Sequence, residues 1–147
     1  MVTLRHFTRE DAEPVRAGLY PDMTGADIRA MIDAWNTRVY QGRYFEMFAV
    51  LSGQGIVGCA SICGRSRGIA SLGIEIFAAE RGKGFASEAL AILSEYVAEK
   101  GYRMILDQVR ADNAASVRLH EKLGFETDGC VYRNRKGHEV VLYMKPV

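Results

Sequence analysis

The sequence predicts an α/β fold in which helices flank a mixed, partly antiparallel sheet. Three strand-like segments follow one another in the middle of the chain, two helix-like segments come before them, and a strand-helix-strand stretch comes after. Strands joined by short turns pair antiparallel, whereas a strand-helix-strand unit supplies a parallel crossover. The full predicted order is β-α-α-β-β-β-α-β-α-β-β, and the length of 147 residues predicts a single domain, residues 1–147.

The first three elements are a strand and two helices. Residues 2–7 alternate between apolar and polar, as in a short strand. Thr8 followed by Asp11, and Thr24 followed by Asp27, are helix-start signals. Apolar residues then recur at helical spacing, first at Ala12, Val15 and Leu19, and later at Ile28, Met31, Ile32, Trp35 and Val39.

The next segments predict an antiparallel meander followed by the longest helix. Residues 44–52, 56–63 and 69–77 are rich in β-branched, aromatic and aliphatic residues and are separated by glycine-containing turns. From Gly84 the period becomes helical, and Gly101 is placed to end that helix. One face of the helix carries Ala86, Ala89, Leu90, Leu93 and Val97.

The last third predicts a strand, a short helix and a hairpin. Residues 104–110 form the strand, and Asn113 caps a helix that runs to about Leu123. Residues 125–133 and 138–144 are expected to pair around the polar turn 134–137.

Composition excludes several classes of function. The chain has 19 basic and 18 acidic residues, a net charge of +1, so nucleic acid is not expected as the main ligand. No apolar stretch reaches the ~18 residues that span a bilayer, which predicts a cytoplasmic protein without membrane contact. The three cysteines form no C-x-x-C pair, so no metal site is expected; Cys59 and Cys63 share a strand face and are expected in the core.

The segment from Arg81 to Ala86 is the clearest candidate for a binding site. It is a glycine-containing turn that opens directly onto a helix, where free N–H groups and the helix dipole attract anions such as a pyrophosphate. The turn lacks both the Gly-Lys-Ser/Thr ending of a P-loop and the G-x-G-x-x-G dinucleotide pattern. In the alternative interpretation, Gly82 and Gly84 only permit a tight turn.

Two motifs in this part of the chain resemble those of one family. Arg81-x-x-Gly84-x-Ala86 is similar to the R/Q-x-x-G-x-G/A signature of the Gcn5-related N-acetyltransferases (GNAT). Residues 113–125, NAASVRLHEKLGF, resemble that family's N-x-x-S-x-x-L-(Y/H)-x-K-x-G-F segment. With the order of elements, the resemblance covers nearly the whole chain, and residues 129–144 resemble the branch that includes ribosomal-protein N-terminal and polyamine acetyltransferases.

The resemblance implies a GNAT-like fold, acetyl-coenzyme A as cosubstrate, and direct transfer of its acetyl group to an amine. The acceptor would be a small-molecule amine or a peptide N-terminus, and a homodimer is possible. By the same resemblance, the backbones of Ile74 and Ile76 would pair with the pantetheine arm, although both are also expected as core residues. The pyrophosphate would be held by Arg81, Gly82, Lys83, Gly84, Phe85, Ala86 and Ser87, with Asn113 reaching the cofactor as well as capping its helix.

Two residues are candidates for proton transfer. His120 occupies the position where many members of the family carry a tyrosine that protonates the departing thiolate, but a packed core histidine is the alternative. Glu75 is the sole charged residue of its strand and is the candidate base for the acceptor amine; the alternative is a solvated carboxylate. A bulge in the strand, usual in the family near this position, would change the face on which Glu75 lies.

Two other functions remain open. A non-catalytic acyl-coenzyme A binding module would keep the phosphate turn without a working proton route. Only residues 65–67 and 133–136, both rich in arginine, favour a nucleic-acid-binding domain, and the near-neutral charge argues against it. By the resemblance, Trp35, Tyr20, Tyr40 and Tyr132 fall in the elements that line the acceptor side, where aromatic residues either shape a pocket or fill the core. Trp35 is expected in the core because it continues the apolar stripe of its helix.

Overall fold

Eight strands form one continuous sheet in the computed structural model, which describes residues 1–53 and 55–147. The strand order across the sheet is β1-β3-β4-β5-β6-β8-β7, and β2 pairs with β3 beside this path. The strands are β1 (Val2–His6), β2 (Val39–Tyr40), β3 (Arg43–Ser52), β4 (Gly55–Ser66), β5 (Ile69–Ile76), β6 (Met104–Arg110), β7 (Tyr132–Arg133) and β8 (Glu139–Pro146). The predicted order of elements is confirmed, with β2 and two short 3-10 turns added.

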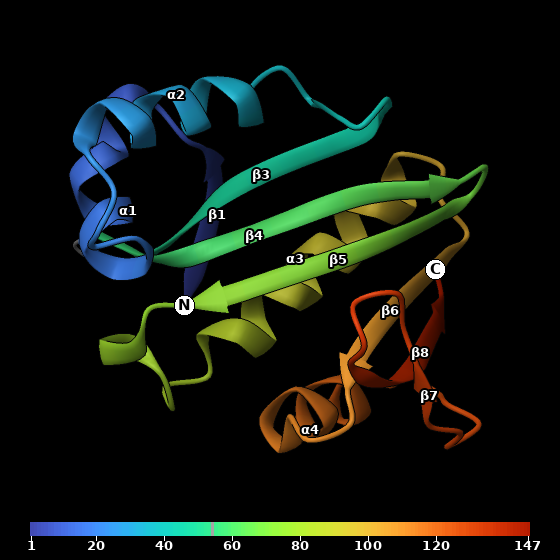
Figure 1. Cartoon of the computed structure of the whole chain (residues 1–147). Coiled ribbons are helices and arrows are strands. Elements are labelled where there is room, and N and C mark those ends of the chain that lie inside the picture. The colour runs from blue at the N-terminus through green and yellow to red at the C-terminus, as the bar shows by residue number, and fades with distance from the viewer. Residues whose placement is uncertain (54) are drawn as a thin grey trace.

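Helices cover both faces of the sheet (Figure 1). Helices α1 (Ala12–Leu19) and α2 (Gly25–Trp35) pack on one face, preceded by the 3-10 turn Arg9–Asp11. Helix α3 (Phe85–Glu99), which follows a second 3-10 turn (Ala78–Glu80), and α4 (Ala114–Lys122) pack on the other. Each face therefore has its own apolar cluster, and Cys59 is buried in the cluster under α1 and α2 while Cys63 is half-buried.

The sheet is mostly antiparallel, but β5 and β6 are parallel and pair at only two positions. These pairs are Ile69 with Met104 and Ala70 with Ile105. Strand β6 then continues with β8 over seven antiparallel pairs, from Met104–Pro146 to Arg110–Val140. Beyond Ala70 the two parallel strands separate, as Figure 1 shows between the end of β5 and the start of α4.

The predicted apolar stripe of the second helix extends too far. Helix α2 ends at Trp35 with Asn36 as its C-cap, and Arg38 has a left-handed φ of 61°. Its carbonyl oxygen accepts from the N–H of Phe45 (3.1 Å), so the chain turns back toward β3. Val39 therefore lies in β2, 57% exposed, because the turn chemistry of Asn36 to Arg38 outweighs the continuing period.

The predicted final hairpin is only partly correct. Tyr132 and Arg133 pair with Val140 and Glu139, and a single bridge joins Glu126 to Met144, but the residues between them leave the ladder. There, Thr127 Oγ1 accepts the N–H of Gly129 (3.1 Å) and Asp128 Oδ1 accepts that of Cys130 (2.9 Å). Side-chain oxygens have replaced strand partners, as is usual at turns built from Thr, Asp and Gly.

Within residues 1–53 and 55–147, none of the helices has the length and apolar character needed to cross a membrane.

Candidate functional site

A pocket of about 820 Å³ lies where β5 and β6 separate. One wall comes from the end of β5, one from the turn that leads into α3 and from the first turn of that helix, and one from α4 (Figure 1). Its lining comprises Ile74, Glu75, Ile76, Glu80, Arg81, Gly82, Gly84, Phe85, Ala86, Ser87, Asn113, Ala115, Ser116, Arg118, Leu119 and Lys122. All the residues predicted to bind the cofactor, except Lys83, line this pocket.

The turn before α3 has the conformation that the glycines predicted. Gly82 and Gly84 have φ values of 79° and 84°, a left-handed region that other residues adopt only with strain. Gly84 is the N-cap of α3 and has no side chain to satisfy the first helical N–H groups. Those N–H groups are therefore available to an anion, and a Cβ atom at either glycine would meet no atom within 4 Å, so the space beside the turn is open.

Strand β5 presents an open backbone edge to the pocket. The N–H of Phe77 donates to the carbonyl oxygen of Val57 (2.8 Å), and the regular β4–β5 register means that odd-numbered β5 residues bond to β4. The backbone groups of Leu72, Ile74 and Ile76 therefore point to the opposite edge. Two hydrogen bonds on that opposite edge support this orientation. The Leu72 N–H donates to Asp107 (2.8 Å), and the Ile76 carbonyl accepts from Arg81 Nε (3.1 Å).

Between these two contacts, the edge at Ile74 faces the pocket without a neighbouring strand among the described residues. An extended ligand with amide groups could pair there as an added strand would. Both isoleucine side chains pack against the apolar cluster under α3. Ile76 thus has the expected core position and Ile74 packs against that core, while the backbone groups of Ile74 and the N–H of Ile76 point toward the pocket edge.

Glu75 lines the pocket from the opposite face of β5 to its two isoleucine neighbours. The β4–β5 register is regular here, with Cys59 opposite Glu75, and its irregularity lies between Gly64 and Ser66; the bulge considered from the sequence is absent near Glu75. Burial, together with the charge of Glu75, raises the pKa of Cys59 to about 12. Burial and the charges of Cys59 and Glu75 also raise the pKa of Tyr20, so Glu75 lies near both groups on the α1 side.

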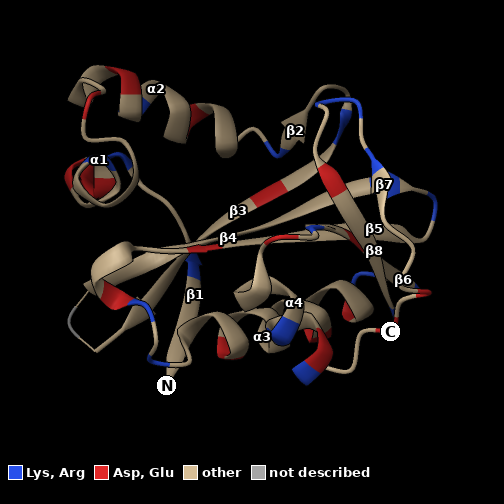
Figure 2. Cartoon of the chain, turned by 60° about the horizontal axis from the view of Figure 1, so that its bottom comes forward, with Lys and Arg blue, Asp and Glu red and all other residues tan. Residues whose placement is uncertain are grey.

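The charged side chains around the turn are partly paired. Lys83 lies outside the pocket lining and forms an ion pair with Glu80 (2.8 Å). The turn before α3 thus carries both acidic and basic residues, red and blue in Figure 2. Arg118 and Lys122 line the pocket from α4 and were not predicted. The signal that would have found them is the spacing of the α4 lining residues 115, 118, 119 and 122, which form one helical face.

His120 does not reach the pocket lining. It is 5% exposed, its Nε2 lies 2.9 Å from Asp107 Oδ2, and its Nδ1 lies 2.8 Å from the carbonyl oxygen of Ser116. Its ring packs against Phe125 and Tyr143. The structure thus separates the two predicted proton carriers, and His120 approaches the pocket only through the Ser116 hydroxyl, 3.4 Å from its Nδ1.

Asn113 has the capping role that the sequence predicted. Its Oδ1 accepts the N–H of Ser116 (3.1 Å) at the start of α4, and the residue also lines the pocket. A role in binding a ligand stays a prediction.

Within residues 1–53 and 55–147, no group of three or more His, Cys, Asp and Glu side chains comes together in a way that would hold a metal ion.

Comparison with known proteins gives a consistent pattern. A family model described as an acetyltransferase (GNAT) domain matches residues 1–126. The SPbeta prophage-derived uncharacterized N-acetyltransferase YokL of Bacillus subtilis (strain 168) is 39% identical over 88 residues, which cover 58% of this chain and 50% of YokL. The match therefore spans half the length of that curated relative.

Two solved structures have the same fold at low sequence identity. An acetyl transferase from Salmonella typhimurium, which modifies the N-terminal serine of the 50S ribosomal subunit protein L7/L12, has a TM-score of 0.82 at 18% identity and covers 99% of this chain and 95% of its own. RimL, a ribosomal L7/L12 alpha-N-protein acetyltransferase in complex with coenzyme A, has a TM-score of 0.82 at 18% identity, covering 99% and 94%.

Proposed function

Because the chain belongs to the GNAT acetyltransferase family, we propose that it transfers the acetyl group of acetyl-coenzyme A to an amine. The observation that carries the proposal is one pocket that combines an open strand edge with a glycine turn at a helix N-terminus. These two features suit the two chemically distinct parts of coenzyme A, its amide-bearing arm and its phosphates. The coenzyme A complex of RimL, which shares the fold, supports the same ligand.

The residues present fit acetyl-coenzyme A as a substrate. The backbones of Ile74 and Ile76 would pair with the pantetheine arm, and the N–H groups of the turn and first helical residues, 82–87, would hold the pyrophosphate. Arg81, Arg118 and Lys122 add positive charge to the pocket lining, which favours phosphates. Lys83 would act only through its charge at the rim, because its ammonium group is paired with Glu80.

Glu75 is the proposed base for the acceptor amine. A peptide α-amino group has a pKa near ~7.7–8.0 and a lysine-like amine has one near ~10.4, so either is mostly protonated at pH 7 and must lose a proton before its nitrogen attacks the acetyl carbonyl carbon. Glu75 takes that proton directly or through water. The C–N bond then forms, the C–S bond breaks and the sulfur leaves as a thiolate, while the second proton on the nitrogen passes to the thiolate or to water. A thiol with a pKa near ~8.5 is a fair leaving group, so little acid assistance is needed.

The proposed acceptor is a peptide N-terminus in preference to a small amine. The names of the two ribosomal-protein acetyltransferases that share the fold support this choice. A panel of peptides and polyamines incubated with acetyl-coenzyme A, with release of free thiol as the readout, distinguishes the two acceptor classes. The same assay tests the alternative of a non-catalytic binding module, which would bind coenzyme A and release no thiol with any amine.

The ligand site is tested by replacing Gly84 with glutamate and measuring coenzyme A binding by calorimetry. A carboxylate at the turn should repel the phosphates and occupy the open space beside the first helical N–H groups. We expect Gly84→Glu to weaken binding at least ~10-fold, which corresponds to about 1.4 kcal/mol.

Gly101→Glu is the matched control. Gly101 also has a left-handed φ, 94°, but follows the other end of α3, so the variant carries similar backbone strain and the same added charge away from the pocket. It should bind coenzyme A as the wild type does. A folded Gly84→Glu variant with wild-type affinity would contradict the proposed site.

A further inference from the structure

Asp107 of β6 takes the place of a strand partner for β5 at the point where the two strands separate. Gly68 accepts N–H groups from Arg103 and Met104 (2.8 and 3.1 Å), and Ala70 pairs with Ile105. The next β5 residue whose backbone faces β6 is Leu72, and its N–H donates to the Asp107 carboxylate. A side chain is longer than a backbone carbonyl, so this contact satisfies Leu72 while it keeps the strands apart.

The other oxygen of the same carboxylate binds α4 through His120. Asp107 Oδ2 lies 2.9 Å from His120 Nε2, and the Asp107 and His120 side chains are 4% and 6% exposed. His120 Nδ1 in turn lies 2.8 Å from the Ser116 carbonyl oxygen. The Ser116 carbonyl and an ionised Asp107 carboxylate can only accept, and both are closer to the ring than the Ser116 hydroxyl at 3.4 Å. Each ring nitrogen is therefore expected to carry a proton, which makes the ring an imidazolium.

Electrostatics agree with this geometry. Burial by itself would lower the pKa of His120, but the hydrogen bonds to Asp107 and to the Ser116 carbonyl outweigh it and raise the pKa. The His120 ring also packs against Phe125 and Tyr143. It has the character of a buried ion pair with its hydrogen bonds satisfied, a type of contact that fixes geometry.

The pair lies behind the two walls of the pocket. One wall is the β5 edge that begins after Leu72, and the other is the α4 face that carries Ala115, Arg118, Leu119 and Lys122. Asp107 contacts the strand and His120 contacts the helix. One carboxylate and one imidazole thus connect the two walls.

We propose that Asp107 and His120 are positioning residues that hold β5 and α4 at a fixed separation and so preform the pocket for coenzyme A. This inference rests on the proposed function for the identity of the ligand. It assigns His120 to ligand affinity through geometry, in place of the proton-donating role that its position in the sequence suggests. Preorganised walls bind without a cost of rearrangement, so loss of the pair should appear as lost affinity.

Two substitutions at Asp107 form the central test. Asp107→Leu has a similar shape but leaves the Leu72 N–H and the His120 ring without their acceptor. Asp107→Asn keeps an oxygen for the Leu72 N–H and offers an N–H to a neutral His120 Nε2. By calorimetry with coenzyme A, we expect Asp107→Leu to weaken binding at least ~10-fold and Asp107→Asn to stay within about threefold of the wild type.

His120 is tested by its effects on substrate affinity and turnover. His120→Gln should raise the KM for acetyl-coenzyme A several-fold more than it lowers kcat, because a positioning residue acts on the bound geometry and not on the proton. An unchanged KM with kcat lowered tenfold or more would make His120 a proton carrier and overturn the proposal. A folded Asp107→Leu variant that binds coenzyme A with wild-type affinity would also overturn the proposal.

General destabilisation is controlled by Ile28→Ala. Ile28 is fully buried on the other face of the sheet, and such truncations cost about 2–5 kcal/mol. This variant should lose thermal stability without losing affinity for coenzyme A. If it loses affinity as Asp107→Leu does, the effect is not one of positioning and the proposal falls.

Hydrogen exchange separates failure of this inference from failure of the proposed function. If the wild type does not bind coenzyme A, the proposed function is wrong, and the strand-spacing role is judged by the Leu72 amide alone. Slow exchange in the wild type and in Asp107→Asn but fast exchange in Asp107→Leu supports that role. Equal exchange in all three proteins overturns it.

Discussion

Glu75 and Cys59 share one small region of the α1 side of the sheet, yet their chemistry differs. Cys59 is buried, and its pKa of about 12 keeps the group as a thiol near neutral pH, which is the inert form. Glu75 is exposed at the pocket and able to exchange a proton with an incoming amine. The acetyl group is therefore expected to reach the amine directly and not by way of Cys59.

Replacing Glu75 with glutamine should slow the reaction without loss of cofactor affinity. Base catalysis typically contributes ~10²- to 10⁴-fold, so we expect kcat to fall at least ~100-fold. Steady-state kinetics with an accepted amine measure kcat, and calorimetry with coenzyme A measures the affinity. The control is Glu80→Gln, a second carboxylate of the pocket lining that should keep kcat near that of the wild type; a Glu75→Gln variant with wild-type kcat would assign the base elsewhere.

Individual residues were predictable where a local backbone demand selects the amino acid. Gly82, Gly84 and Asn113 have the turn and capping conformations that their types favour. His120 shows what sequence reasoning cannot predict. The motif gives the position of His120 along α4 but not whether its side chain faces the pocket or the core. Its partner Asp107 lies 13 residues away on β6, and nothing local in the sequence pairs the two.

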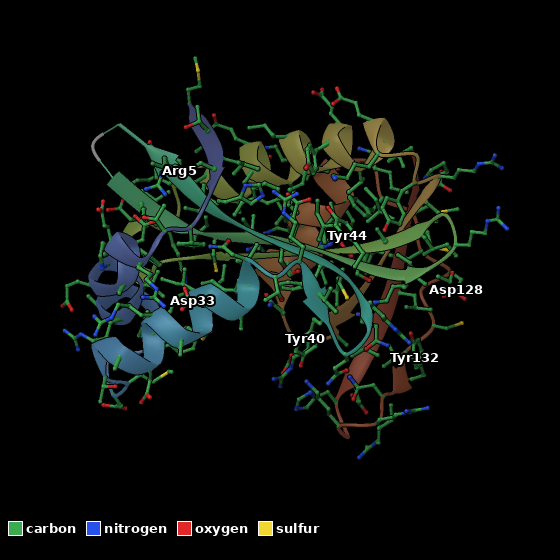
Figure 3. All side chains as sticks on the ribbon, turned by 90° about the horizontal axis from the view of Figure 1, so that it is seen from above. Arg5, Asp33, Tyr40, Tyr44, Asp128 and Tyr132 are labelled. Carbon is green, nitrogen blue, oxygen red and sulfur yellow. The ribbon has the colours of Figure 1, made fainter. Side chains whose placement is uncertain are left out.

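A buried carboxylate connects three elements on the α3 side of the sheet. Glu46 of β3 is fully buried and accepts hydrogen bonds from Tyr44 and from the Tyr96 hydroxyl of α3 (3.1 Å), with His6 of β1 at 2.6 Å and Lys100 at 3.4 Å. Figure 3 shows Tyr44 among the side chains packed in the middle of the molecule, whereas Tyr40 and Tyr132 lie nearer its margin. The cluster holds the C-terminal half of α3 against β1 and β3.

Glu46→Gln should make the protein less stable at neutral pH and less sensitive to acid. Burial by itself would raise the pKa of Glu46, but the hydrogen bonds from Tyr44, His6 and Tyr96 and the charge of Lys100 lower it. A lowered pKa contributes stability above the unfolded value of about 4.3, and that contribution is lost as pH falls through the folded value.

We expect urea denaturation at pH 7 to show a loss of about 3 kcal/mol in the free energy of unfolding for Glu46→Gln. The difference from the wild type should shrink as the pH approaches 3. Glu13→Gln, which removes an exposed ion pair with Arg16, is the control and should unfold like the wild type. A constant difference across this pH range would show that Glu46 is not ionised in the folded protein.

Segments whose apolar residues recur at a regular spacing were predicted well. Segments whose backbone hydrogen bonds go to side chains were not. The meander, α3 and β6 are near their predicted bounds, because apolar periodicity and glycine ends agree there. The strand predicted for residues 125–133 is interrupted because the Thr127 and Asp128 side chains accept the N–H groups of Gly129 and Cys130. β-propensity cannot anticipate this competition.

The sheet as a whole consists of two parts joined by a short seam. Strands β1 to β5 form one part and β6 to β8 the other, and the parallel ladder between them has two residue pairs. The order of elements predicted this crossover. The early end of the parallel ladder depends on contacts of Asp107 and α4, which no single segment of the sequence encodes.

Basic residues occur in several parts of the molecule, including the loops beside β2 and β7, which are blue in Figure 2. The expected lack of nucleic-acid binding stays a prediction.

A ligand that contacts both parts should stabilise the whole molecule. Coenzyme A at 100 times its Kd should add about 2.7 kcal/mol to the free energy of unfolding. For a chain of this size that raises Tm by roughly 5–10 °C, measurable by calorimetric melting. Gly101→Glu should show the full shift and Gly84→Glu little or none; an equal shift in both would mean that the ligand binds away from the turn.

The open edge of β5 also affects how freely the sequences of proteins with this fold can change. In the proposed function it offers main-chain groups to the ligand, and these are the same for every amino acid except proline. Ile74 and Ile76 can therefore change to other apolar residues without altering what the ligand meets. Recognition through the main chain would constrain the sequence little, in keeping with solved structures that share this fold over 99% of the chain, with a TM-score of 0.82, at 18% identity.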